Sequence, residues 1–185
     1  MTTLTLNKKT AAYNAARSWA DGFTPALNQI SCNLIFGNAK LMSVYFKTPT
    51  DYQDRKLGTD QIIEMDKLRM SYRIRENKYM PYFLQGFTIR CSAKYGESEL
   101  EKIMNNPAHA DFLLYAIADE KEYGVVECAV LIDLKVLGAY LKAYPEAIEK
   151  AHKGQGFIEF KYDDLPKAVV AGTWNLTRKG EVSCQ

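Results

Sequence analysis

Residues 112–134 read FLLYAIADEKEYGVVECAVLIDL, two apolar runs separated by a charged turn that ends in a glycine. Apolar runs with almost no polar interruption are typical of strands that are covered on both faces of a sheet. The turn between them indicates that the two strands form a hairpin. This stretch therefore predicts a pair of central, buried strands, and we expect the rest of the fold to assemble around them.

Further strands are expected on both sides of this hairpin. Residues 60–65 and 68–75 are predicted to pair across Asp66–Lys67, and residues 86–91 to follow as the third strand of a meander. Residues 30–46 place apolar side chains at alternating positions and predict one or two strands, broken at a Gly-Asn turn. The segment FIEFKY, residues 157–162, predicts the last strand.

Helices are expected in three places. Residues 7–21 are rich in alanine at helical spacing, and a turn at Thr24–Pro25 follows them. Residues 97–106 place apolar side chains on one face after Ser98, a suitable N-cap, and residues 135–150 predict a helix that Pro145 interrupts. These elements predict an α/β (α+β) fold with a mixed central sheet flanked by helices. We expect one domain over residues 1–175 and a flexible tail over residues 176–185.

The composition restricts the function only weakly. The chain has 185 residues and a formal net charge of +2, so the total charge does not indicate a polyanionic partner. Its four cysteines form neither a CxxC motif nor a Cys/His pair at zinc-ligand spacing, which argues against bound zinc. The N-terminus lacks the apolar run of a signal peptide and no segment has the length of a membrane span, so we expect a cytoplasmic protein without a membrane partner.

The distribution of charge is more informative than its total. Residues 67–94 have a local charge of +6, because they contain seven cations and one acid, Glu76. The cations are Lys67, Arg69, Arg73, Arg75, Lys78, Arg90 and Lys94. Tyr72 and Tyr79 lie between them, and cations with stacking rings are what a phosphate backbone and its bases require. Arg73 and Arg75 are two positions apart in a predicted strand and would point to the same side. The alternative is a solvated sheet face whose arginines pair with acids elsewhere.

Carboxylates lie immediately upstream, in the passage DYQDRKLGTD. It contains Asp51, Asp54 and Asp60, the last of which opens a predicted strand. Magnesium binds through one or two carboxylates and retains several waters, so Asp60 with Asp54 predicts a Mg²⁺ site. The alternative for Asp51 and Asp54 is an ordinary role in a turn.

The order of these segments resembles a known superfamily. The succession DRKLGTD, SYRIR, GFTIR, SELEKI and LIDL, over about residues 51–135, is similar to proteins of the PD-(D/E)XK nuclease superfamily. The resemblance implies a restriction-endonuclease-like fold and a metal-dependent nuclease acting on DNA. In that superfamily an Asp opens one strand, an acid-x-Lys ends the neighbouring strand, and the two acids hold magnesium. Asp60 matches the first position, so the resemblance implies that it is a catalytic metal ligand.

The second position departs from the superfamily pattern. The matching strand ends Ser71-Tyr72-Arg73-Ile74-Arg75, without the second acid and with Arg in place of Lys. Arginine is always protonated, so Arg73 and Arg75 could act in catalysis only by stabilising an anionic transition state. If Asp60 binds a metal, another carboxylate must replace the missing one. Asp54, Glu76 and Glu99 are the candidates by position.

A second candidate site follows the same order of residue types further along the chain. Asp111, a hairpin, and then Asp133-Leu134-Lys135 reproduce the acid, hairpin, acid-x-Lys order with the expected residue types. The surrounding apolar runs instead favour buried central strands. Asp133 then has an alternative role as the N-cap of the helix that follows it.

These observations support three hypotheses. The first is a Mg²⁺-dependent nuclease that grips DNA phosphates through Arg69, Arg73, Arg75, Lys78, Arg90 and Lys94, with Tyr72 and Tyr79 as stacking rings. The second is a catalytically inactive phage or mobile-element protein of the same fold, which binds nucleic acid or a host protein that handles it. The third is an interaction domain whose exposed tyrosines form a protein–protein patch.

Overall fold

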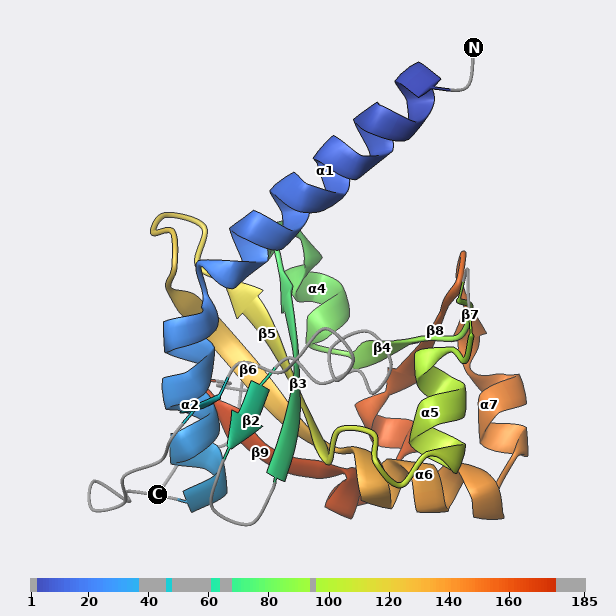
Figure 1. Cartoon of the computed structure of the whole chain (residues 1–185). Helices are drawn as coiled ribbons and strands as arrows, with labels where there is room; N and C mark the ends of the chain where they lie inside the picture. Colours follow the sequence, from blue (N-terminus) through green and yellow to red (C-terminus); the bar gives the residue numbers. More distant parts are fainter. Residues whose placement is uncertain (1–2, 37–45, 48–60, 64–67, 94–95, 176–185) are drawn as a thin grey trace.

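A computed structural model describes residues 3–36, 46–47, 61–63, 68–93 and 96–175 (Figure 1). Within this part of the chain, the larger of two sheets has six strands in the order β1-β2-β3-β5-β6-β9. The strands are β1 (Phe46–Lys47), β2 (Gln61–Ile63), β3 (Leu68–Arg75), β5 (Phe112–Ala118), β6 (Val126–Asp133) and β9 (Val170–Trp174). β3 and β5 run parallel and the other neighbours antiparallel, so the sheet is mixed.

A smaller sheet and several helices surround the larger one. The smaller sheet has the order β4-β8-β7, with β4 (Gly86–Arg90), β8 (Phe157–Lys161) and β7 (His152–Lys153). The α-helices are α1 (Thr3–Asp21), α2 (Thr24–Phe36), α4 (Met80–Phe83), α5 (Glu99–Asn105), α6 (Leu134–Ala143) and α7 (Glu146–Lys150). Short 3-10 turns are η1 (Asn77–Tyr79), η2 (Tyr162–Asp164) and η3 (Lys167–Val169). The predicted class, a mixed central sheet flanked by helices, is confirmed.

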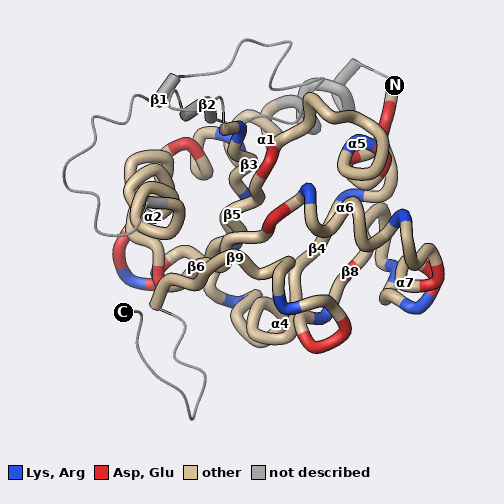
Figure 2. Tube along the Cα trace, turned by 90° about the horizontal axis from the view of Figure 1, so that it is seen from below, with Lys and Arg blue, Asp and Glu red and all other residues tan. Residues whose placement is uncertain are grey.

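The two faces of the larger sheet bury different partners. Figure 2 shows α2 on one side of β3, β5 and β6, and α5, α6, α7 and the smaller sheet on the other. Leu114, Ala116 and Leu131 pack toward Phe23 and Leu27 beneath α2. The alternate residues of the same strands form the second core cluster with α5, α6, β4 and β8. Because β5 and β6 are covered on both faces, their uninterrupted apolar sequence has a direct structural reason.

Several predicted elements are confirmed. β5 and β6 form the hairpin expected from residues 112–134, and β2 pairs antiparallel with β3, as expected from the hairpin of residues 60–75. Ser98 is the N-cap of α5: its hydroxyl accepts from the Glu101 N–H at 3.2 Å, and the Glu101 carboxylate accepts from the Ser98 N–H at 2.6 Å. Pro145 separates α6 from α7 as predicted.

The prediction of a strand beginning at residue 30 is wrong for residues 30–36, which are helical. Helix α2 begins at Thr24 and continues through Phe36, so Thr24 and Pro25 start a helix instead of making a turn. Phe23, Leu27 and Ile30 are buried at helical spacing against the sheet. The alternation at Cys32, Leu34 and Phe36 coincides with the last turns of this helix. Residues 37–45 lie outside the described part of the chain.

The predicted meander of β2, β3 and β4 is also wrong. β4 pairs with β8 in the smaller sheet, while the position beside β3 is occupied by β5. The turn η1 and the helix α4 lie between β3 and β4 and take the chain out of the larger sheet. The last strand is β9, which the sequence did not predict and which covers the open edge of β6.

Helix α1 extends beyond the body of the fold (Figure 1). Residues 11–18 are all exposed, and contact with the rest of the chain begins near Trp19. Among the helices formed by described residues, none combines the length and the apolar character needed to cross a membrane. The predicted tail, residues 176–185, lies outside the described part.

Candidate nucleic-acid interface

The predicted phosphate-binding arginines of β3 lie on one side of the strand, as their spacing requires. Arg73 donates to the backbone oxygen of Thr88 on β4, and Arg75 lies over the ring of Phe157 on β8. Both side chains therefore face the smaller sheet. Tyr72 points to the opposite side, where its hydroxyl donates to Asn28 Oδ1 on α2 at 2.9 Å. Tyr72 packs beneath α2 and does not share a face with the arginines.

Arg73 is neutralised by a carboxylate from α5. Its Nη2 lies 2.5 Å from Glu99 Oε2, and the two side chains are only 16% and 13% exposed. The same oxygen accepts from the backbone N–H of Arg90 at 2.8 Å. Burial alone would raise the pKa of Glu99, but the Arg73 guanidinium and the Arg90 N–H outweigh it and hold that pKa below its usual value. Glu99 is thus a charged, half-buried counter-ion of Arg73.

Arg69 is bound in a second internal ion pair. Its Nε and Nη2 donate to the two carboxylate oxygens of Asp111, both at 3.2 Å, and its backbone N–H donates to Oδ2 at 2.8 Å. Lys135 lies 3.5 Å from the same carboxylate and donates to the backbone oxygens of Pro107 and His109. This network ties the segment between α5 and β5 to β3 and α6.

The second candidate site is brought together only in part. Asp111 and Lys135 are neighbours, but Asp133 is the N-cap of α6: its Oδ1 accepts from the N–H groups of Lys135 and Val136, both at 2.9 Å. This is the alternative role that the sequence suggested for Asp133. The carboxylate of Asp133 is committed to the helix start, and that of Asp111 to two cations.

Arg75 and Arg90 differ from the arginines described so far. Each guanidinium carbon lies 5.7 Å from the centroid of the Phe157 ring, within the range of a cation–π contact. Among the residues that the structure describes, neither has a carboxylate within ion-pair distance. Arg90 is exposed and Arg75 half-buried. Two positive groups therefore converge on one ring without a described counter-ion.

Lys78 and Tyr79 lie on η1, just beyond the end of β3. Lys78 Nζ is 2.5 Å from Glu76 Oε2, with the two side chains 62% and 57% exposed. The ammonium also lies 5.2 Å from the centroid of the Tyr79 ring, and Tyr79 is exposed. An exposed pair of this kind contributes little to stability and can be rearranged by a ligand.

The predicted metal ligands are not assembled in the described part of the chain. Asp54 and Asp60, together with Lys94, lie outside it. Among the described residues, no group of three His, Cys, Asp or Glu side chains is arranged to hold a metal ion. Glu99 does not fit a Mg²⁺ ligand, because a guanidinium occupies its carboxylate and would repel a cation. Glu76 is likewise paired, with Lys78.

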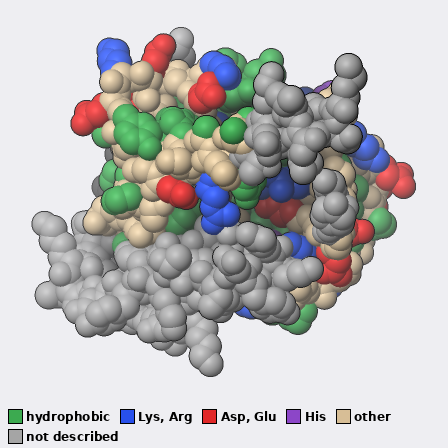
Figure 3. Space-filling view, turned by 45° about the horizontal axis from the view of Figure 1, so that its top comes forward, with side chains coloured by type: hydrophobic (Ala, Val, Ile, Leu, Met, Phe, Trp, Pro, Cys, Tyr) green, Lys and Arg blue, Asp and Glu red, His purple; other side chains and the backbone are tan. Residues whose placement is uncertain are grey.

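Charge pairing is visible over the surface as well. On the face drawn in Figure 3, basic side chains lie directly beside acidic ones. This is the arrangement expected if arginines of the basic segment pair with acids elsewhere, and Arg69 and Arg73 follow it. The segment of residues 67–94 is therefore less cationic in the folded protein than its sequence indicates.

Phe157 is the residue that sequence reasoning missed. The only signal is the alternation within FIEFK: Ile158 and Phe160 are buried in the core, which leaves Phe157 on the other face of β8. Comparisons of the chain with protein-family models, with curated proteins and with solved structures find no match.

Proposed function

We propose that the chain binds the phosphate backbone of nucleic acid through Arg75 and Arg90, which both lie over the Phe157 ring. The observation that supports the proposal is the contrast in counter-ions: Arg69 and Arg73 have described carboxylate partners, whereas Arg75 and Arg90 have none. A guanidinium without a counter-ion can fork onto phosphate oxygens without first breaking an ion pair. The Phe157 ring lies within cation–π range of both guanidinium groups and is an aromatic surface on which a base can stack.

The binding does not require catalysis. Glu99, which contacts Arg73, serves as a counter-ion, so the described residues support a binding protein better than a nuclease. This corresponds to the catalytically inactive protein that the resemblance to the PD-(D/E)XK superfamily allows. DNA is the partner that the resemblance implies, and the chemistry of the site fits any exposed phosphate backbone.

A Mg²⁺-dependent DNA nuclease is the second candidate function. One observation favours it: β2 begins at Gln61, directly after Asp60, and pairs with the arginine-bearing strand β3. This strand order agrees with the superfamily pattern, in which an Asp opens the strand next to the one that ends in the basic residue. The ligands would then be Asp60 and Asp54, with Arg73 and Arg75 stabilising the transition state.

The binding proposal is tested by fluorescence anisotropy with a labelled single-stranded DNA oligonucleotide and the corresponding duplex at low salt. We expect saturable binding that falls at least tenfold in Arg75→Ala/Arg90→Ala, because two charge-assisted contacts to phosphate are lost. The matched control is Lys142→Ala/Lys167→Ala, which removes two exposed charges on α6 and η3 and should bind as the wild type does. Equal affinity of the arginine double variant and the wild type would contradict the proposal.

The nuclease candidate has a separate test. Wild-type protein is incubated with DNA and Mg²⁺ or Mn²⁺, alongside Asp60→Ala. Cleavage that disappears in Asp60→Ala would establish the nuclease. Binding without cleavage would leave the binding proposal intact and exclude the second candidate.

A further inference from the structure

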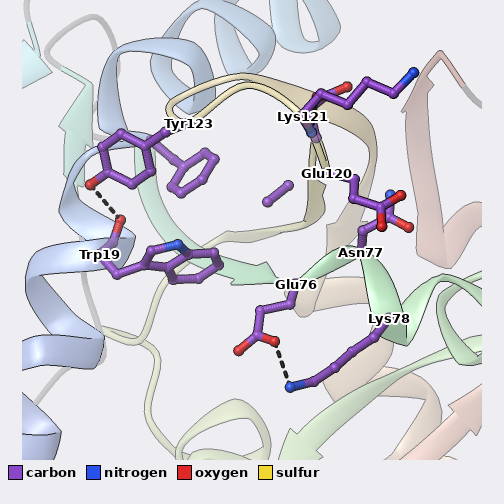
Figure 4. Close-up of a pocket in the computed structure, with 10 residues that line it drawn as sticks. Trp19, Glu76, Asn77, Lys78, Glu120, Lys121 and Tyr123 are labelled. Atoms are coloured by element: carbon purple, nitrogen blue, oxygen red, sulfur yellow. Dashed lines mark hydrogen bonds and ion pairs between the residues drawn. The ribbon is translucent and has the colours of Figure 1, made fainter.

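A pocket of about 450 Å³ lies at the end of the larger sheet, and neither Arg75, Phe157 nor Arg90 is among its lining residues (Figure 4). Glu76, directly after β3, and Asp119, directly after β5, line it from the carboxyl ends of the two parallel strands. Trp19 closes it from the last turns of α1. Its volume is within the range of pockets that bind small ligands or single side chains.

The aromatic wall of the pocket is held in place by contacts of its own. The Trp19 and Phe23 rings lie 4.9 Å apart, and the Tyr123 ring meets Phe23 edge-on at 5.3 Å. The Tyr123 hydroxyl donates to the backbone oxygen of Trp19 at 3.2 Å. Gly22 permits this approach, because a Cβ there would lie 2.0 Å from the Tyr123 oxygen. The wall is therefore preformed, which lowers the entropic cost of binding.

The charged side chains of the pocket favour a cation. Three carboxylates line it, Glu76, Asp119 and Glu120, against two lysines. Lys78 is paired with Glu76 at 2.5 Å, but both side chains are more than half exposed, so a ligand cation can compete for the Glu76 carboxylate. The Asp119 carboxylate accepts from the N–H groups of Lys121 and Glu122, which lowers its pKa and keeps it charged. In Figure 4 the Lys121 side chain extends away from Trp19, whereas the Glu76 carboxylate lies on the side of the indole.

We propose that this pocket takes the side chain of an arginine or lysine presented by a protein partner. The cation would lie against the indole of Trp19, where a cation–π contact is strongest, and beside the carboxylates of Glu76 and Glu120. The aliphatic stem would cover the remaining apolar wall. A nucleotide fits less well, since its phosphate would meet three carboxylates. The inference is independent of the proposed function, because it involves other residues and a ligand of opposite charge.

The test uses the full chain and follows the indole N–H resonances of Trp19 and Trp174 by NMR, assigned with Trp174→Phe. The probe is N-acetyl-arginine amide, and its neutral isostere is N-acetyl-citrulline amide. We expect the Trp19 resonance to shift saturably with a Kd of about 1 mM for the arginine probe, and at least tenfold weaker binding for citrulline. dAMP, as an anionic aromatic probe, should leave the Trp19 resonance unchanged.

Variants of the pocket show whether its carboxylates contribute to binding of the arginine probe. Glu120→Gln on the exposed rim should weaken binding of the arginine probe severalfold, whereas Glu146→Gln, exposed on α7, should not. Equal shifts from arginine and citrulline, a larger response to dAMP, or no response of Trp19 to the arginine probe would each overturn the proposal. Arg75→Ala/Arg90→Ala should bind the arginine probe as the wild type does, so a failure here is distinguishable from a failure of nucleic-acid binding.

Discussion

Arg73 and Arg75 are two residues apart on the same side of β3, yet their surroundings differ. Arg73 is 16% exposed, contacts Glu99 at 2.5 Å and donates to a backbone oxygen of β4. Arg75 lies over Phe157, as Arg90 does, and has no described carboxylate partner. The comparison shows that a basic run in a sequence does not indicate one function. Arg73 joins α5 to the sheet through Glu99, whereas Arg75 has no carboxylate partner among the described residues.

The difference between the two arginines originates in helix α5. The capping box at Ser98 fixes where the helix begins and so places Glu99 in its first turn, within ion-pair distance of Arg73. The Arg90 N–H then holds the Glu99 carboxylate from the other side. Arg75 lies two residues further along β3, on the same side of the strand. Its guanidinium therefore contacts Phe157 on β8 instead of the Glu99 carboxylate.

The largest effect is expected from breaking the Arg73–Glu99 pair. Glu99→Gln leaves the half-buried Arg73 without its counter-charge, which should cost about 3 kcal/mol of unfolding free energy. Urea denaturation measures the loss, with Glu97→Gln, an exposed site two residues earlier, as the charge-matched control. An unchanged denaturation midpoint in Glu99→Gln would show that the pair is not structural.

A smaller effect is expected from pH on the same pair. The pKa of Glu99 is lowered in the folded protein, so its contribution to stability is complete above the usual pKa of 4.5 and is lost as the pH falls below that value. The stability difference between wild type and Glu99→Gln should therefore shrink below about pH 4.5. A difference that stays constant from neutral to acid pH would be inconsistent with a charged Glu99. Urea titrations at a series of pH values supply the measurement.

The smallest effect is expected at the Phe157 ring, which contacts Arg75 and Arg90. Phe157→Leu removes the ring that positions Arg75 and Arg90 through cation–π contacts of roughly 0.5–1 kcal/mol each, and it removes a stacking surface, so affinity for single-stranded DNA should fall a few-fold. Phe157→Tyr keeps the ring and should bind as the wild type does. Anisotropy titrations of both variants measure the affinities. An equal loss of affinity in Phe157→Leu and Phe157→Tyr would show that the aromatic ring does not contribute to binding.

The sequence predicted the elements whose signal is local. The nearly uninterrupted apolar runs within residues 112–134 indicate strands that are buried on both faces. Ser98, followed by Glu101, indicates the start of a helix. Residues 30–36 were predicted wrongly because the alternation at Cys32, Leu34 and Phe36 conceals a helical repeat that begins earlier, at Phe23. The strand β9 and the pairing of β4 with β8 escaped prediction because their partners are distant in sequence.

The candidate site was predictable to a lesser degree. The sequence named Arg75 and Arg90 as phosphate ligands and Glu99 as a carboxylate of interest. It could not assign Glu99 to Arg73, since the two are 26 residues apart on different elements. Phe157, further still along the chain, meets the arginines only because β8 pairs with β4. Which arginines are neutralised depends on tertiary structure, and a charge count along the chain does not contain that information.

The salt dependence of DNA binding tests most directly whether Arg75 and Arg90 neutralise phosphates. The logarithm of the association constant for a single-stranded oligonucleotide is plotted against the logarithm of salt concentration for the wild type, Arg75→Ala/Arg90→Ala and Lys142→Ala/Lys167→Ala. If Arg75 and Arg90 each neutralise one phosphate, the slope of their double variant should be shallower by about 1.4, while the lysine control keeps the wild-type slope. An unchanged slope in the arginine variant, or an equal decrease in the lysine control, would contradict the assignment.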